Sequence, residues 1–372
     1  MQCAPLSLVQ QRIQVGVPLP FNIRDHDQTL LLAQGQLVTT DAQLGALLAR
    51  GALVDLAELL SPAERIAHAP AANLPALWTA CLGQLSRTLQ TAQHTGFRAA
   101  LDASSAPVLA LVARDPDLAI VQVLRQPGNQ YLDYGLHHAN HAAITTWLVA
   151  QRLGWSAEES QRGFKAALTM NLAMFALQGQ LAAQRTPPTQ AQRAAIQAHP
   201  AGSRAMLEGA GVQDADWLTA VEQHHEAADG SGYPHGLRQP SDLAALLRRA
   251  DIYTAKLSPR ATREAIAADK AGRMMFMQEP GHPMVTALVK EFGVYPPGCF
   301  VRLASGESGM VVRRGATVMT PTVAVFSNCQ GRPLAQPERR DTAVKAHAIH
   351  AVLPGTAGAQ LPPTQLLALL AA

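Results

Sequence analysis

The sequence predicts a mainly α-helical protein, with a small α+β unit before a helical bundle and a short β-rich extension after it. Of the 372 residues, 48% are hydrophobic and only 15% are charged, which favours closely packed helices with a lightly charged surface. Apolar residues recur at threes and fours from about Leu74 to Leu288, and the period changes to two further along the chain. We therefore expect three domains, at residues 1–70, 71–290 and 291–372.

The N-terminal unit is predicted to contain a β-hairpin and a short helix. Apolar and polar positions alternate on both sides of residues 25–28, so residues 19–24 are expected to pair with residues 29–33. Thr40 then caps a helix that Gly51 ends. The Asp-His-Asp run of the turn looks like a set of metal ligands, but a polar hairpin turn explains it better.

Turn residues divide the central stretch into about eight helices. Each break contains proline, glycine or both, which end helices or begin turns. The breaks fall at residues 115–116, 126–128, 186–188 and 209–211. The expected result is a bundle of helices joined by loops.

Short strands are expected after the segment Tyr-Pro-Pro-Gly at residues 295–298. Alternating apolar positions predict strands at residues 300–303, 309–312 and 322–326. One further strand is expected near residues 348–353, followed by a weak terminal helix.

Composition and charge exclude several classes of function. The formal net charge is only +3, and no basic cluster is interleaved with aromatic residues, so polymeric nucleic acid is not an expected ligand. The cysteines form no C-x-x-C pair, which excludes a zinc ribbon and a disulfide framework and suits a reducing cytoplasm. They are Cys3, Cys81, Cys299 and Cys329. No segment has about 18 uninterrupted apolar residues, so no membrane association is expected.

The most informative segment is residues 224–234, which read His-His-Glu-Ala-Ala-Asp-Gly-Ser-Gly-Tyr-Pro. Two adjacent imidazoles with nearby carboxylates can hold a hydrolytic metal and activate its water. Gly230 and Gly232 permit backbone angles closed to other residues, so the helix that carries the histidines is expected to end there. The alternative is a helix end at which the histidines only cap carbonyl groups, but capping needs one histidine and no such glycine-rich sequel.

Three further ligand candidates lie on other predicted helices. His138 lies at the start of one helix, His199 precedes a proline at another, and Asp251 lies on a third. Taken alone, His199 could mark a helix end and Asp251 could belong to a buried ion pair. Together with the histidines of residues 224–225, they would supply four imidazoles and one carboxylate, which suits a hydrolytic metal centre inside a bundle.

Residues 224–234 resemble the signature of HD-GYP proteins, a branch of the HD-superfamily phosphohydrolases associated with hydrolysis of the bacterial second messenger cyclic di-GMP. The resemblance extends from about Asp133 to about Ala265 and implies an HD-type helical bundle. It implies a divalent transition metal, iron or manganese, held by His138, His199, His224, His225 and Asp251. It implies that phosphate is contacted by Arg260, with Arg263 as a second candidate. The loop that would meet a partner comprises Asp229, Gly230, Gly232, Tyr233 and Pro234.

The chain departs from this family at three positions that matter for catalysis. Met170 and Asn171 stand where the family has its His-Asp pair, and Met174 stands where it has a lysine. In the family, that aspartate bridges the metals and that lysine helps to hold the phosphate. Thioether and amide groups bind hard metal ions weakly, and losing a residue that only orients a ligand already costs about 10–100-fold. Neighbouring histidines, His137 and His141, are not expected to compensate, because they project from other faces or turns of the helix.

Three functions are consistent with these residues. The first is a degenerate HD-GYP domain that binds cyclic di-GMP, a related nucleotide or a GGDEF-type cyclase domain, with weak hydrolysis or none. The second is an active metal-dependent phosphodiesterase with an altered metal site. The third is a scaffold for the flanking domains, which explains poorly why five ligand positions are present. The sequence leaves open whether any metal is bound and whether the chain forms a homodimer.

Overall fold

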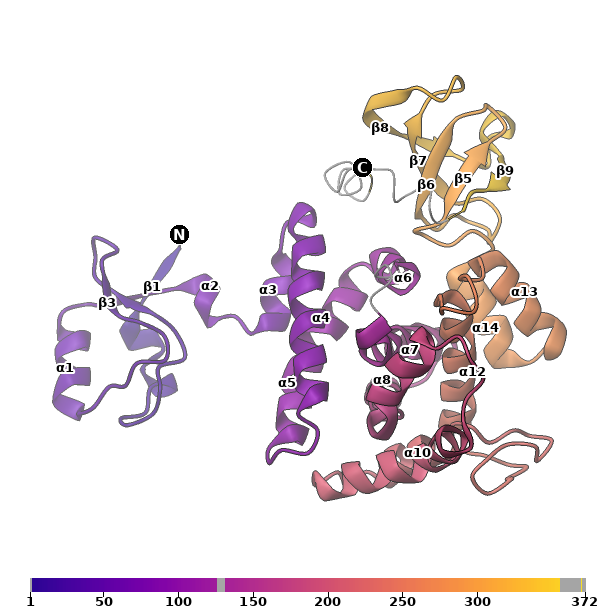
Figure 1. The fold of residues 1–372 in the computed structure, drawn as a ribbon. Coiled ribbons are helices and arrows are strands. Elements are labelled where there is room, and N and C mark those ends of the chain that lie inside the picture. The colour runs from indigo at the N-terminus through magenta and orange to yellow at the C-terminus, as the bar shows by residue number, and fades with distance from the viewer. Residues whose placement is uncertain (1, 126–130, 355–368, 370–372) are drawn as a thin grey trace. The chain divides into compact units, whose positions relative to one another are not determined.

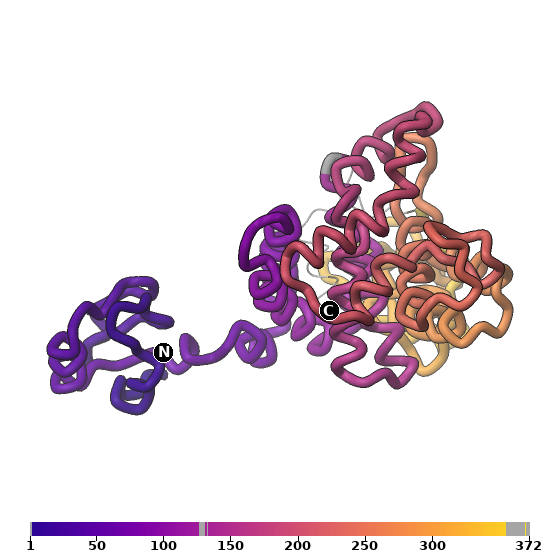
Figure 2. The backbone as a smooth tube through the Cα atoms, turned by 90° about the horizontal axis from the view of Figure 1, so that it is seen from below, coloured from indigo at the N-terminus to yellow at the C-terminus, as the bar shows by residue number. Residues whose placement is uncertain are grey.

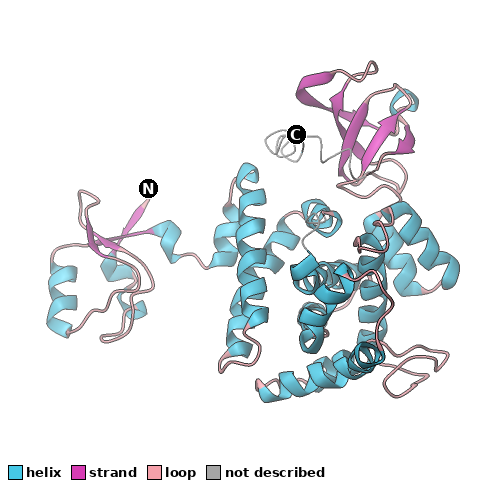
Figure 3. Cartoon of the chain, viewed as in Figure 1, coloured by secondary structure: helices cyan, strands magenta, loops and turns pink. Residues whose placement is uncertain are grey.

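The computed structural model describes residues 2–125, 131–354 and 369, and the chain divides into two compact units, residues 1–70 and 71–372 (Figure 1). The backbone trace shows the same two units from below (Figure 2). Helices account for most of the regular structure, and two small sheets accompany them (Figure 3). The predicted fold class, a mainly α-helical bundle with two β-containing additions, is confirmed. Among the described helices, none combines the length and the apolar character needed to cross a lipid bilayer.

The N-terminal unit contains a four-stranded sheet in the order β1-β4-β2-β3. Strands β2 (Ile23–Arg24) and β3 (Leu30–Leu32) form the predicted hairpin, although they are shorter than expected. Strands β1 (Cys3–Pro5) and β4 (Leu53–Asp55) were not predicted. Alternation of apolar and polar residues cannot be recognised in a strand of three residues, because its detection needs a run of about four to eight residues.

Three helices complete the N-terminal unit. Helix α1 (Asp41–Ala49) begins as predicted, because the Thr40 hydroxyl accepts a hydrogen bond from the Gln43 amide. Its leucines pack against the buried core of the sheet. Helices α2 (Leu56–Leu59) and α3 (Pro62–His68) follow.

The second unit begins with a helical bundle. Its described part contains eleven α-helices, which is more than the eight or so expected. They are α4 (Leu74–Gln90), α5 (Phe97–Arg114), α6 (Pro116–Leu124), α7 (Tyr134–Arg152), α8 (Ala157–Thr169), α9 (Phe175–Ala183), α10 (Gln190–Gly209), α11 (Ala215–Gln223), α12 (Asp242–Leu257), α13 (Ala268–Gln278) and α14 (Pro283–Phe292). The predicted breaks at residues 115–116, 186–188 and 209–211 each separate two helices. The break at residues 126–128 lies outside the described residues.

Helix packing brings distant parts of the sequence together. Helix α7 packs against α8, α9 and α12, while α11 packs against α8, α10 and α12. Helix α10 continues through His199 and Pro200, so the alternative in which His199 marks a helix end is wrong. A proline inside a helix leaves one backbone hydrogen bond unmade, and α10 accommodates this loss at Pro200. His199 therefore lies in the middle of a helix.

A five-stranded antiparallel sheet in the order β8-β7-β6-β5-β9 follows the bundle, within the same compact unit. Strands β5 (Phe300–Leu303), β6 (Ser308–Arg313), β7 (Thr322–Ser327) and β9 (Ile349–Val352) lie where strands were predicted. Strand β8 (Pro333–Asp341) was not predicted, because it is a charged, largely exposed edge strand without apolar alternation. Arg313 donates to Asp115 at 2.6 Å and so connects the sheet to the bundle. The predicted terminal helix lies outside the described residues.

Candidate functional site

The loop that follows α11 carries the most informative segment of the sequence. Helix α11 ends at Gln223, and His224 is its C-cap. The helix therefore ends before the histidines, and the expectation that it ends at the glycines is wrong. Gly230 has a φ of +80°, which favours glycine. Gly232 is required for a different reason, because a Cβ there would lie 2.5 Å from the carbonyl oxygen of His225. The two glycines therefore shape the loop in different ways.

Two carboxylates hold this loop in place. Glu226 is 1% exposed, and its carboxylate accepts hydrogen bonds from the backbone amides of His235 at 2.7 Å and Leu237 at 2.8 Å. Asp229 accepts from the amide and the hydroxyl of Ser231 at 2.9 and 2.6 Å. Asp229 therefore stabilises the turn. The role of Glu226 was not predicted, since it depends on amides nine and eleven residues away.

Three histidines converge at the start of this loop. His199, His224 and His225 offer ring nitrogens that all lie within 4.8 Å of one another. Burial is the main cause that lowers the pKa of His199 and His224 to about 4 and the pKa of His225 to about 3. All three imidazoles are therefore neutral near pH 7, which is the state that binds metal ions.

Hydrogen bonds fix the orientation of two of these rings. Nδ1 of His199 lies 2.6 Å from the carbonyl oxygen of Ile196. Nδ1 of His224 likewise lies 2.6 Å from the carbonyl oxygen of Val221. Because a carbonyl oxygen only accepts, both Nδ1 atoms carry the proton and both Nε2 atoms keep a free lone pair. These Nε2 atoms face each other at 3.2 Å, an arrangement that repels itself without a cation and fits a metal ion.

His138 and Asp251 form a second polar pair beside these histidines. Nε2 of His138 lies 2.7 Å from Oδ1 of Asp251, and the ring of Tyr134 stacks on His138 with centroids 5.8 Å apart. Burial alone would raise the pKa of Asp251, but the hydrogen bond with His138 holds it below its usual range. Asp251 is therefore an anion. Nδ1 of His138 is buried and has no hydrogen-bond partner among the described residues.

One cavity of about 160 Å³ brings most of the predicted site residues together. It is lined by His138, Asn171, Met174, His199, His225, Tyr233, Asp251 and Arg260, among others. His224 does not line it, but its ring lies 4.2 Å from the ring of His225. His137 and His141 do not line it either, so neither replaces the missing family histidine at this cavity.

The three departures from the family occupy different places. Met170 is fully buried and does not line the cavity, so its thioether belongs to the packed core. Asn171 and Met174, which are 2% and 8% exposed, do line the cavity. The segment between α8 and α9 therefore presents a neutral amide and an apolar thioether to the space that His225 and Asp251 also face.

The two candidate arginines differ in where their guanidinium groups lie. Arg260 lines the cavity and donates to the Tyr134 hydroxyl at 3.2 Å, and its guanidinium lies 5.5 Å from the centre of the Tyr134 ring. Arg263 donates instead to the carbonyl oxygen of Ala255 at 2.6 Å and does not line the cavity. Tyr134 was not predicted. Its position four residues before His138 on one helix was the available signal, since such residues share a face.

Comparison with known proteins shows that residues 133–280 match a family described as HD domain. A cyclic di-GMP phosphodiesterase of Pseudomonas aeruginosa is 36% identical over 143 residues, which cover 37% of this chain and 34% of that protein. A 3′3′-cGAMP-specific phosphodiesterase of Vibrio cholerae is 26% identical over 175 residues, which cover 46% of this chain and 35% of that protein. The chain thus spans about a third of the length of these curated relatives.

A solved structure shares the fold. It is described as an HDG"Y"P protein from Bdellovibrio bacteriovorus, with a TM-score of 0.50 and 14% sequence identity. The match covers 77% of this chain and 97% of that chain. At 14% identity this likeness shows a shared fold alone.

Proposed function

Residues 133–280 form an HD-GYP domain, and from this premise we propose that the domain binds a cyclic dinucleotide, cyclic di-GMP or a related one, with weak hydrolysis or none. One observation above all supports the proposal. Asn171 and Met174 line the same cavity as His225 and Asp251, so a ligand there meets neutral groups where the family presents an anion and a cation. Binding groups are present, whereas part of the catalytic set is replaced.

The residues of the cavity fit a single transition-metal ion, iron or manganese in this proposal. His199, His224 and His225 would hold it, because their nitrogens converge and their rings are neutral. Imidazole suits such metals, and the carbonyl hydrogen bonds of two rings are the kind of support that orients a metal ligand. When bound, the ion would supply Lewis-acid polarisation of a phosphate oxygen. His138 and Asp251 would form the neighbouring polar wall.

Arg260 is the proposed contact for a ligand phosphate. Its guanidinium is planar and always charged, and the ring of Tyr134 holds it at the cavity. Asn171 would offer an amide to a ligand but no charge for bridging two ions. Met174 would leave one phosphate charge without a partner. These properties favour binding over turnover.

Calorimetry with cyclic di-GMP, combined with product chromatography, tests the proposal. The full chain should bind the nucleotide and release little linear product in the presence of excess manganese or iron. An Arg260→Ala variant should bind at least about tenfold more weakly, since hydrogen bonds to charged groups contribute about 1.5–3 kcal/mol. Absence of nucleotide binding by the wild-type chain would refute the proposal.

The second candidate function is an active phosphodiesterase with an altered, single-metal site. The convergence of three neutral histidines beside the Asp251 carboxylate favours it. Steady release of linear product that disappears in a His199→Ala variant would support this candidate over the first. A metal-loaded chain that releases no product would reject it.

The exposed loop around Ser231 is the proposed contact for a partner. It would meet a GGDEF-type cyclase domain or a second copy of the chain, and co-sedimentation with a purified cyclase domain tests the first of these.

A cytoplasmic location is also part of the proposal. The four cysteines are all free thiols, as a reducing compartment would keep them.

A further inference from the structure

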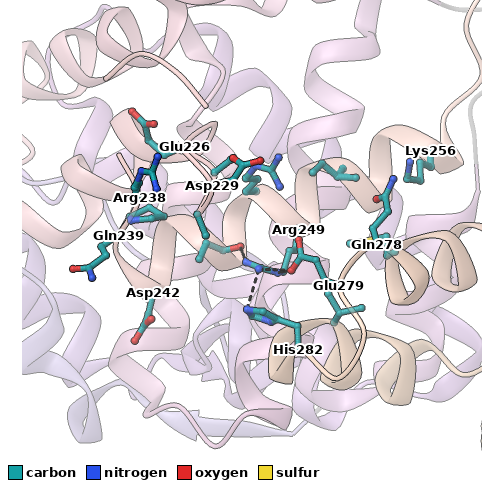
Figure 4. Close-up of a pocket in the computed structure, with 18 residues that line it drawn as sticks. Glu226, Asp229, Arg238, Gln239, Asp242, Arg249, Lys256, Gln278, Glu279 and His282 are labelled. Carbon is teal, nitrogen blue, oxygen red and sulfur yellow. Dashed lines mark hydrogen bonds and ion pairs between the residues drawn. The ribbon is translucent and has the colours of Figure 1, made fainter. Parts of the chain in front are cut away.

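A second and larger cleft lies on another side of the glycine-rich loop. It has a volume of about 930 Å³. Small-molecule sites typically measure about 300–1,000 Å³, and the volume of this cleft lies in that range. Figure 4 shows residues of this cleft, with Arg238 and Lys256 toward opposite ends and Arg249, Glu279 and His282 between them.

The cleft and the histidine cavity share their supporting elements. Helix α12 presents Arg248, Ile252 and Lys256, which are four residues apart, to the cleft. The same helix presents Asp251 to the histidine cavity. The loop likewise places His225 at the cavity and residues 226–229 at the cleft. A ligand in the cleft would therefore contact the reverse side of the segments that build the proposed metal site.

Three cations of the cleft have no ion-pair or hydrogen-bond partner among the described residues, although, besides the hydrogen bonds of Ser231, the charge of Arg248 contributes to lowering the pKa of the nearby Asp229. Arg238, Arg248 and Lys256 make no ion pair and no side-chain hydrogen bond with any residue that the structure describes. Only the fourth cation is engaged, because Arg249 donates to Glu279 at 3.0 Å and to His282 at 2.9 Å. The cleft therefore offers three unused cationic donor groups.

The acidic residues of the cleft are mostly engaged, although they equal the cations in number. Glu279 binds Arg249, Glu226 binds two loop amides, and Asp229 binds Ser231. Asp242 is the only lining acid among the described residues without such a partner. Free hydrogen-bond donors therefore exceed free acceptors, which suits an anion.

We propose that this cleft is a second ligand site, for a small molecule that carries more than one phosphate group. Guanidinium groups match phosphate geometry, and an ammonium group adds a compact positive charge. Arg238 and Lys256 lie toward opposite ends of the cleft, so a ligand that meets both would carry anionic groups at more than one point. This inference goes beyond the proposed function, because it concerns neither the histidines nor Arg260.

Isothermal titration of the full chain at low salt with inorganic pyrophosphate, guanosine 5′-diphosphate and citrate tests this site. We expect one site for each phosphate probe and weaker binding of citrate. Arg248→Ala combined with Lys256→Ala should weaken pyrophosphate binding at least about tenfold, since each lost charged hydrogen bond is worth about a factor of ten. Arg248→Gln combined with Lys256→Gln should do the same with less change in packing.

Two control variants locate the binding. Arg273→Ala removes an exposed cation of α13 that does not line the cleft, and Arg260→Ala removes the cation of the histidine cavity. The Arg273 variant should bind pyrophosphate within about twofold of wild type, because Arg273 does not line the cleft, whereas the Arg260 variant reports any binding at the histidine cavity. The proposal is overturned if no phosphate probe binds, if only Arg260→Ala weakens binding, or if citrate binds as tightly as pyrophosphate. Tighter binding of the nucleotide than of pyrophosphate would identify a nucleotide as the ligand class.

Discussion

Two walls of the histidine cavity differ in what they offer a ligand. The wall formed by α10 and the residues after α11 supplies His199 and His225, whose neutral rings converge with His224. The wall formed between α8 and α9 supplies Asn171 and Met174. The first wall presents the imidazoles that would hold a metal in the proposed function, whereas the second presents neutral groups where the resemblance implies an anion and a cation. The proposal therefore separates holding an ion from using it for hydrolysis.

The difference has a physical reason in how each wall is built. On the first wall, the histidines are tied to backbone carbonyls, and the loop beside them is held by the buried Glu226. Beside the second wall, Met170 is fully buried in the core, so an apolar residue satisfies the packing there. Replacing a buried polar group together with its hydrogen-bonding partner by apolar groups of the same shape can be nearly neutral for stability. A packed apolar residue at position 170 is therefore compatible with the fold.

The largest expected effect comes from removing a histidine of the first wall. His224→Ala should weaken metal binding by more than about 100-fold, because loss of a direct ligand costs more than loss of a group that orients one. Elemental analysis of the purified chain should then find almost no iron or manganese. His141→Ala is the matched control, since His141 is also buried but does not belong to the group of three histidines whose ring nitrogens converge. Equal metal content in the two variants would contradict the proposal that His224 belongs to a metal site.

Restoring the second wall should have the next largest effect. Asn171→Asp together with Met174→Lys returns the anion and the cation, so hydrolysis of cyclic di-GMP should rise by about 10–100-fold. Product chromatography with excess manganese measures the change. Met174→Leu keeps the wall apolar and should leave the rate as it was. A metal-loaded double variant without increased turnover would show that these residues do not limit hydrolysis, and Met170→His would then be added.

Much of this arrangement could be predicted from the sequence, because local patterns determine it. The segment at residues 224–234 identified the histidine cluster, and apolar alternation located strand β5 to the residue. Whether Met170 or Asn171 faces the cavity depends on the rotation of a helix end against its neighbours, which no spacing specifies. The contact of Tyr134 with Arg260 joins residues 126 positions apart and likewise follows from packing.

The glycine-rich loop provides a test of how the first wall keeps its shape. Glu226→Gln removes a charge and leaves one acceptor for the two backbone amides, which should cost about 1–2 kcal/mol of local stability. Hydrogen exchange at the amides of His235 and Leu237 should accelerate by about tenfold as a result. Glu158→Gln, on the surface of α8, should leave this exchange unchanged, since the Glu158 side chain is 84% exposed and does not contact the loop amides. Unchanged exchange in the Glu226 variant would mean that other contacts hold the loop.

The smallest expected effect concerns the residue that links His138 to the phosphate contact. Tyr134→Phe keeps the ring that stacks on His138 and underlies Arg260, but it removes the hydroxyl that accepts the Arg260 hydrogen bond at 3.2 Å. Cyclic di-GMP should bind about 2–5-fold more weakly, because the hydroxyl only orients Arg260 and its loss removes only part of the about 1.5–3 kcal/mol of a hydrogen bond to a charged group. Tyr134→Leu also removes the cation–π contact and should weaken binding further, with metal content unchanged. If calorimetry finds equal affinity for cyclic di-GMP in the Phe and Leu variants, the ring of Tyr134 does not position Arg260. The Arg260 guanidinium would then bind the nucleotide without support from Tyr134.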